Sequence, residues 1–99
     1  MTRILITGSN SGAFGDPNVI DGNDSYAIGN DNTIQGDNTL ATGSDNVIGD
    51  DAADLDANDN TVTGNRNTIA EGADDNQVSG DDNSVVGGDR NLVNGDGNT

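Results

Sequence analysis

The side chains of this 99-residue chain that could do chemistry are almost all carboxylates. Aspartate and glutamate together number 18, arginine and lysine together number 3, and histidine and cysteine are absent. Without histidine, cysteine or lysine, no serine has an evident base to activate it as a nucleophile. The pairs Asp74-Asp75 and Asp81-Asp82 lie in predicted turns, with no apolar neighbours of the kind that surround a catalytic acid or base. We therefore expect a protein that is not an enzyme, with no catalytic residues and no cofactor.

Calcium and ice are two ligands that such a chain could still bind. Asp24, Asp31, Asp45 and Asp59 fall in predicted turns, and oxygen ligands suit Ca²⁺. The calcium-binding β-roll repeat is a nonapeptide, however, and Gly87-Gly88-Asp89 is an isolated fragment of it. We interpret the four carboxylates as a solvated acidic rim rather than metal ligands, with structural Ca²⁺ as the alternative. Ice binding would need a flat T-x-T array, and because Thr61-Val62-Thr63 is the only such triplet, the sequence does not favour it.

The elements that carry these residues repeat every seven residues. Each unit reads N/S-x-Φ-x-G-x-x, where Φ is apolar, and units begin at Ile4, Ser11, Asn18, Ser25, Asn32, Thr39, Asn46, Ala53, Asn60 and Asn67. The alternation predicts a short strand, and the glycine with the polar pair after it predicts a turn. A helical heptad is excluded, because a glycine in nearly every unit would cost about 1 kcal/mol each inside a helix. The period is therefore typical of a stacked repeat.

Consecutive units alternate in type, so the full repeat is fourteen residues, with two strands and two turns in each coil. Coils stacked about 4.8 Å apart would align Asn18, Asn32, Asn46 and Asn60 in one inward ladder of amides. The register is expected to hold from Ile4 to Asn67, and then to jump near Glu71-Gly72 and at Gly87-Gly88 through bulged turns. The sequence thus predicts an all-β fold, a parallel β-solenoid or β-roll, with residues 1–99 as a single domain.

Composition excludes several classes of partner. The formal net charge of −15 argues against binding to nucleic acid or to an anionic membrane. No apolar run is long enough to span a membrane, and the apolar start, residues 1–6, is too short for a signal peptide. Low hydrophobicity and high charge usually indicate disorder, but the strict repeat argues for a folded chain.

Outward-facing apolar residues predict an oligomer interface. Those of the first half are Leu5, Phe14, Val19, Tyr26, Ile28, Leu40 and Val47. Phe14, Tyr26, Ile28 and Leu40 fall on the sheet of Ser- or Thr-led units, as a stripe that a lone chain rarely exposes. We therefore expect these seven residues to form a homotrimer interface in an apolar-faced half, residues 1–49, which trimerises and docks. The other half, residues 50–99, is acidic and polar.

The segments Ser11-Gly12-Ala13-Phe14-Gly15 and Ser25-Tyr26-Ala27-Ile28-Gly29 resemble the S-x-A-x-G head repeats of trimeric autotransporter adhesins, the YadA-like heads. The resemblance extends over nearly the whole chain at the level of pattern. It implies a left-handed parallel β-roll of fourteen residues per coil, with three rolls packed through one sheet. Alternate units depart from it, with Asn for Ser and Ile for Ala, and no stalk, barrel anchor or export signal is recognised. The resemblance therefore supports the roll and the trimer rather than adhesin biology.

Together these features predict a non-enzymatic structural protein, a homotrimeric β-roll displayed on a larger assembly. We expect a component of a phage virion surface, either a capsid decoration protein or a short fibre, whose partners are itself and a capsid or other assembly protein. The alternative is a bacterial adhesin or fibre module on the cell surface.

Overall fold

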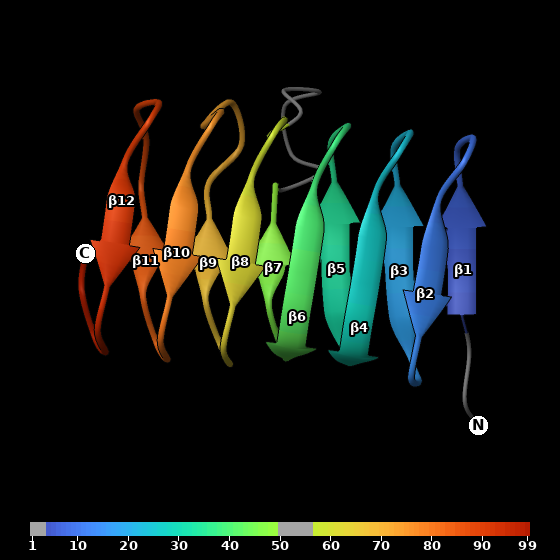
Figure 1. The fold of residues 1–99 in the computed structure, drawn as a ribbon, viewed down its shortest axis with the longest axis horizontal. Coiled ribbons are helices and arrows are strands. Elements are labelled where there is room, and N and C mark those ends of the chain that lie inside the picture. The colour runs from blue at the N-terminus through green and yellow to red at the C-terminus, as the bar shows by residue number, and fades with distance from the viewer. Residues whose placement is uncertain (1–3, 50–56) are drawn as a thin grey trace.

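The computed structural model describes residues 4–49 and 57–99, and over these residues it contains two parallel sheets of six strands each and no helix. Sheet A contains β1 (Ile4–Thr7), β3 (Asn18–Asp21), β5 (Asn32–Gln35), β7 (Val47–Ile48), β9 (Thr68–Ile69) and β11 (Ser84–Val85). Sheet B contains β2 (Gly12–Phe14), β4 (Tyr26–Asn30), β6 (Leu40–Ser44), β8 (Thr61–Thr63), β10 (Gln77–Ser79) and β12 (Leu92–Asn94). The chain alternates between the sheets, so each coil adds one strand to each of them (Figure 1). The predicted all-β parallel β-solenoid is confirmed.

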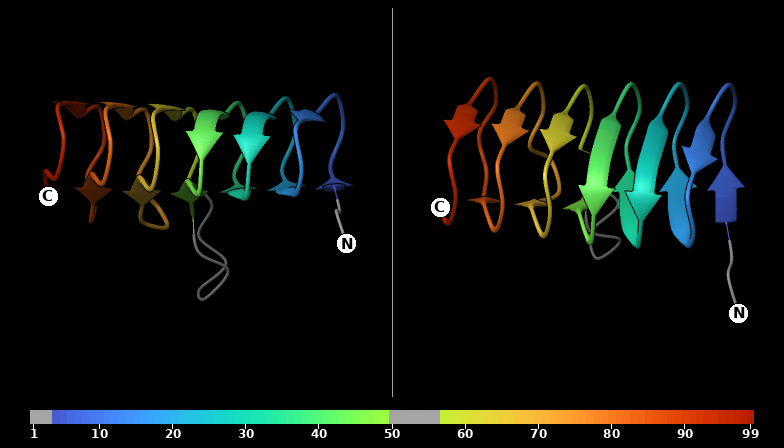
Figure 2. Two further views of the ribbon diagram at one scale, coloured as in Figure 1. Left: turned by 90° about the horizontal axis from the view of Figure 1, so that it is seen from below. Right: turned by 60° about the horizontal axis from the view of Figure 1, so that its bottom comes forward.

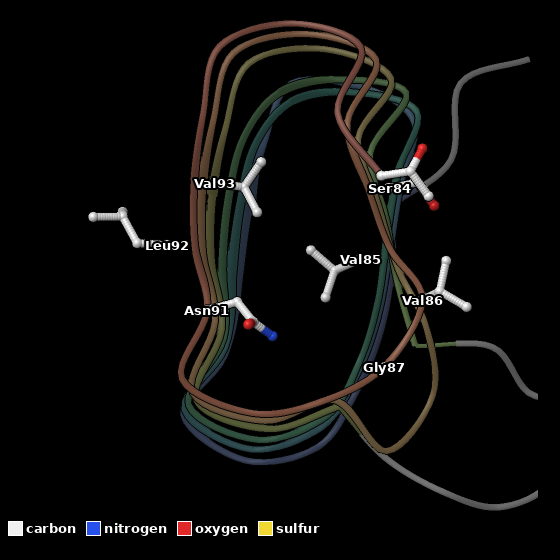
Figure 3. A pocket seen from close by; sticks show the side chains of 8 residues that line it. Ser84, Val85, Val86, Gly87, Asn91, Leu92 and Val93 are labelled. Carbon is white, nitrogen blue, oxygen red and sulfur yellow. The ribbon is translucent and has the colours of Figure 1, made fainter.

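The core is one thin apolar strip between the two sheets. The third residue of each unit points inward, and each such residue stacks on its counterpart in the next coil, as Ile20 does on Ile34 and Ala27 on Ala41. Ile20, Ile34, Ile48 and Ile69 line the sheet A side and are at most 1 % exposed. On the sheet B side, Ala27 and Ala41 give way to Val62 and Val78. A view down the roll shows Val85 and Val93 facing one another across this interior (Figure 3).

The turns need glycine because successive coils touch there. A Cβ on Gly29 would overlap the carbonyl oxygen of Gly43, and the φ of Gly29 is +126°, a value that side-chain-bearing residues rarely adopt. Two residues later the chain again takes a positive φ, at Asp31 and, one coil on, at Asp45. Aspartate and asparagine tolerate this conformation better than most residues do, which explains the polar pair that follows each glycine.

The expected unbroken register from Ile4 to Asn67 is wrong. Ala27 pairs with Ala41, fourteen residues on, but Ala41 pairs with Val62, twenty-one residues on. Seven extra residues therefore enter between Asn46 and Asn60, and the predicted unit led by Ala53, with its apolar residue Leu55, lies outside the described residues. As a result, units after the insertion lie in the opposite sheet from the one that the regular period predicts. Asn60 therefore precedes β8 of sheet B and not a strand of sheet A.

Every irregular connection runs from sheet A to sheet B. The steps from Asn46 to Asn60, from Asn67 to Asn76 and from Asn83 to Asn91 take 14, 9 and 8 residues, whereas each step from sheet B to sheet A takes 7. Figure 2 shows the loop after β9 projecting beyond the row of sheet A strands, while the outer side of the sheet B row is unobstructed. The jumps predicted near Glu71-Gly72 and Gly87-Gly88 leave the strands stacked in register.

Candidate functional site

Asparagine side chains form a buried ladder along sheet A. The Nδ2 group of Asn32 donates to Oδ1 of Asn18 at 3.1 Å and to the carbonyl oxygen of Gly43 at 2.8 Å. The backbone N–H of Asn32 also donates to Oδ1 of Asn18, at 3.1 Å. Asn46 repeats the pattern on Asn32. These hydrogen bonds tie each coil to the next along sheet A.

The predicted fourth member of this ladder, Asn60, is not in line with Asn46. Asn67 takes that place, with Nδ2 donating to Oδ1 of Asn46 at 3.1 Å. Asn60 instead follows Thr39 in the sheet B ladder, where its Nδ2 group donates to the carbonyl oxygen of Ala73 at 2.8 Å. The cause is the seven-residue insertion before Asn60.

The outer face of sheet A carries one straight column of small side chains. Leu5, Val19, Thr33, Val47, Thr68 and Ser84 are paired in strict register, one on each strand. Hydrophobicity alone predicts only the apolar members of this column, Leu5, Val19 and Val47. The polar members, Thr33, Thr68 and Ser84, are found only by aligning the second position of every sheet A unit. Beside the column lies a single strand carboxylate, that of Asp21, which is exposed.

The outer face of sheet B is free of charge. Its outward residues are Gly12, Phe14, Tyr26, Ile28, Leu40, Thr42, Thr61, Thr63, Gln77, Ser79, Leu92 and Asn94. The predicted stripe of Phe14, Tyr26, Ile28 and Leu40 lies together here, around a shallow groove of about 440 Å³. The other three predicted interface residues, Leu5, Val19 and Val47, lie on sheet A instead. The seven residues thus fall on two opposite faces.

Apart from Asp21, the carboxylates of the described residues lie in the turns outside the strands. Asp74 and Asp81 accept the backbone N–H groups of Asn58 and Asn65 in the preceding coil, each at 2.8 Å. Among the described residues, no group of three or more His, Cys, Asp or Glu is arranged to hold a metal ion. Asp74 and Asp81 thus tie neighbouring turns together through their hydrogen bonds to the backbone.

One exposed ion pair joins two coils at the rim. Nε of Arg66 donates to Oδ1 of Asp82 at 2.7 Å, and Nη2 donates to Oδ2 at 2.9 Å. This hydrogen-bonded pairing lowers the pKa of Asp82 and raises the pKa of Arg66. Both groups are open to water, so the pair stabilises the fold only weakly.

A pocket of about 320 Å³ lies at the open end of the roll beside β11 and β12. Val85, Asn91 and Val93 point into it, while Val86 and Leu92 point away on opposite sides (Figure 3). The pocket continues the apolar interior, and none of the residues that line it is charged.

Within the described residues, no helix is long and apolar enough to cross a membrane.

Comparison with known families identifies the repeat. No curated protein matches the chain. The family model described as the grass antifreeze beta roll matches residues 2–74, which is most of the chain. The match agrees with the parallel β-roll seen in the structure and does not single out the YadA-like heads. The chain belongs to the grass antifreeze beta roll family.

Proposed function

We propose that this protein binds ice through the outer face of sheet A. The observation that carries the proposal is the column Leu5, Val19, Thr33, Val47, Thr68 and Ser84, which is uncharged in a chain of net charge −15. The name of the family, an antifreeze β-roll, supports the same reading.

The chemistry of the column suits a solid surface of water. Neighbouring strands of a sheet lie about 4.8 Å apart, so the column offers methyl and hydroxyl groups at one regular spacing. Apolar groups such as Val19 and Val47 favour an ordered water layer over bulk water, and the hydroxyl of Thr33 can hydrogen-bond to that layer. The buried amide ladder beneath holds the strands in place, so little conformational entropy is lost on binding.

Sheet A is favoured over sheet B because its column of outward side chains contains no aromatic ring. On sheet B, the ring of Phe14 is 79 % exposed and would hold a flat crystal face away from its neighbours. On sheet A, the loop after β9 projects beyond the strands (Figure 2), so we expect the contact to centre on Val19, Thr33 and Val47.

A matched pair of variants tests which face binds. Thr33→Arg places a long, hydrated charge in the middle of the sheet A column and should abolish most of the thermal hysteresis and the inhibition of ice recrystallisation. Thr63→Arg places the same charge on sheet B, at an exposed threonine, and should leave both activities nearly unchanged. Equal loss in both variants, with circular dichroism intact, would refute the assignment to sheet A.

A second candidate function is display on a larger assembly as a homotrimer. It is favoured by the apolar stripe of Phe14, Tyr26, Ile28 and Leu40 on sheet B, and by the resemblance of the Ser-led units to YadA-like heads. On this proposal, residues 1–49 dock on a phage virion, or on a cell surface, and the acidic half projects. Negative-stain images of the source particle, labelled with an antibody to this chain, test it: an unlabelled particle surface contradicts it.

A further inference from the structure

The outer face of sheet B is the part of the described surface on which two copies of this chain could meet without charge repulsion. All of its outward strand residues are uncharged, whereas the turns on both sides carry aspartates. Two chains of net charge −15 repel each other at every rim. An acidic or basic partner would gain nothing from this face, because the face offers it no charge to pair with.

The same face has a projecting side chain next to a notch. Phe14 is 79 % exposed, and the neighbouring outward position of β2 is Gly12, which has no side chain. The ring of Tyr26 leans over that position, since a Cβ on Gly12 would lie 3.2 Å from its Cδ1 atom. The groove of about 440 Å³ is bordered by these rings and by Ile28 and Leu40. A face that carries both a projection and a groove is self-complementary, as a symmetric interface between identical chains requires.

The size of the face sets the strength of the contact. The molecule is 31 Å long, and two outward columns about 7 Å apart, with their side chains, give roughly 500 Å² per partner. The total of roughly 1,000 Å² lies at the lower limit for specific interfaces. Self-association should therefore depend on concentration rather than form an obligate complex.

We propose that the outer face of sheet B is a docking surface for a second copy of this chain, with Phe14 of one copy seated in the groove of the other. The contact leaves sheet A free on the opposite side. The docking proposal does not rest on ice binding, so either proposal can be correct when the other is wrong.

The test is sedimentation equilibrium of the full chain from about 5 to 500 µM, because weak symmetric contacts form over micromolar concentrations. The wild-type chain should change from the monomer mass of 10.0 kDa to the mass of two chains. Phe14→Asp should remain a monomer over the whole range. Because Phe14 is 79 % exposed, the change removes no core contact, and circular dichroism should be unaltered.

Val86→Asp is the matched control, since Val86 is 71 % exposed and points away from the opposite side of the roll (Figure 3). It should associate like the wild type. A wild-type chain that stays monomeric at 500 µM, or a Phe14→Asp variant that associates normally, would overturn the proposal. If the wild type is a monomer and Phe14→Asp loses ice activity, sheet B is the ice face and the docking surface is refuted.

Discussion

At the scale of single residues, the buried asparagines decide whether one coil holds the next. Asn32 is 1 % exposed, and its side chain donates to Asn18 and Gly43 and accepts from Asn46. Asn32→Ala leaves the Gly43 carbonyl and the Asn46 N–H without these partners. At about 1–3 kcal/mol for each buried unsatisfied group, the free energy of unfolding should fall by roughly 2–6 kcal/mol.

Urea denaturation measures this loss, and Asn94→Ala is the control. Asn94 is exposed on β12, so its replacement should change the free energy of unfolding by less than about 0.5 kcal/mol. Equal stability of Asn32→Ala and the wild type would mean that the ladder contributes no net stability.

At the scale of the elements, the sequence predicts the strands and turns well, because the inward residues and the turn residues recur at the same positions in successive units. The inward positions of β3 and β5 are recognisable from Asn18, Ile20, Asn32 and Ile34 alone. The insertion after β7 could not be detected in this way. It is one full unit long, so Leu55 and Ala57 still fall in phase with the period, and only the pairing of Leu40 with Thr61 reveals it. A triplet search likewise looks along one strand and cannot detect a column that runs across strands.

The insertion yields a prediction of its own. Deleting residues 50–56 joins Gly49 to Ala57 and restores seven residues between Asn46 and Asn60. Ala57 already occupies the coil position above Gly36, since its N–H donates to the carbonyl oxygen of Gln35 at 3.1 Å. The shortened chain should therefore keep its β circular dichroism and its melting temperature within a few degrees, because the length of a connection changes stability only slightly. A chain that fails to fold after this deletion would contradict the stacking of β8 directly on β6.

A deletion of the same length that removes a strand of sheet A serves as the comparison. Removing residues 29–35 takes away the whole of β5, with its inward Asn32 and Ile34, so the stack loses one of its strands. That variant should be strongly destabilised or unfolded. Similar melting temperatures for the two deletions would mean that coils can be removed from the roll at no cost.

At the scale of the whole molecule, charge opposes compactness. Eighteen carboxylates and a net charge of −15 surround a thin core, so self-repulsion should lower the melting temperature at low salt. Exposed charges more than about 10 Å apart are largely screened at 0.1 M salt, so the melting temperature should rise between low salt and about 0.5 M NaCl. If the carboxylates of Asp24, Asp31, Asp45 and Asp59 are a solvated rim, calcium should act only as a generic divalent ion.

Magnesium at equal ionic strength is the control for calcium. A large rise in melting temperature with calcium at about 1 mM or less, absent with magnesium and reversed by a chelator, would contradict the solvated rim. It would make these aspartates calcium ligands.

The central claim is that one outer face of this roll recognises ice, and partition into a slowly growing ice shell tests it most directly. A non-binding acidic protein is pushed into the liquid as the crystal advances, because ice excludes charged solutes. The wild-type chain should instead be enriched in the ice fraction, and Thr33→Arg should return to the liquid while Thr63→Arg remains in the ice. Exclusion of the wild-type chain from ice, to the same extent as the acidic control protein, would contradict the account.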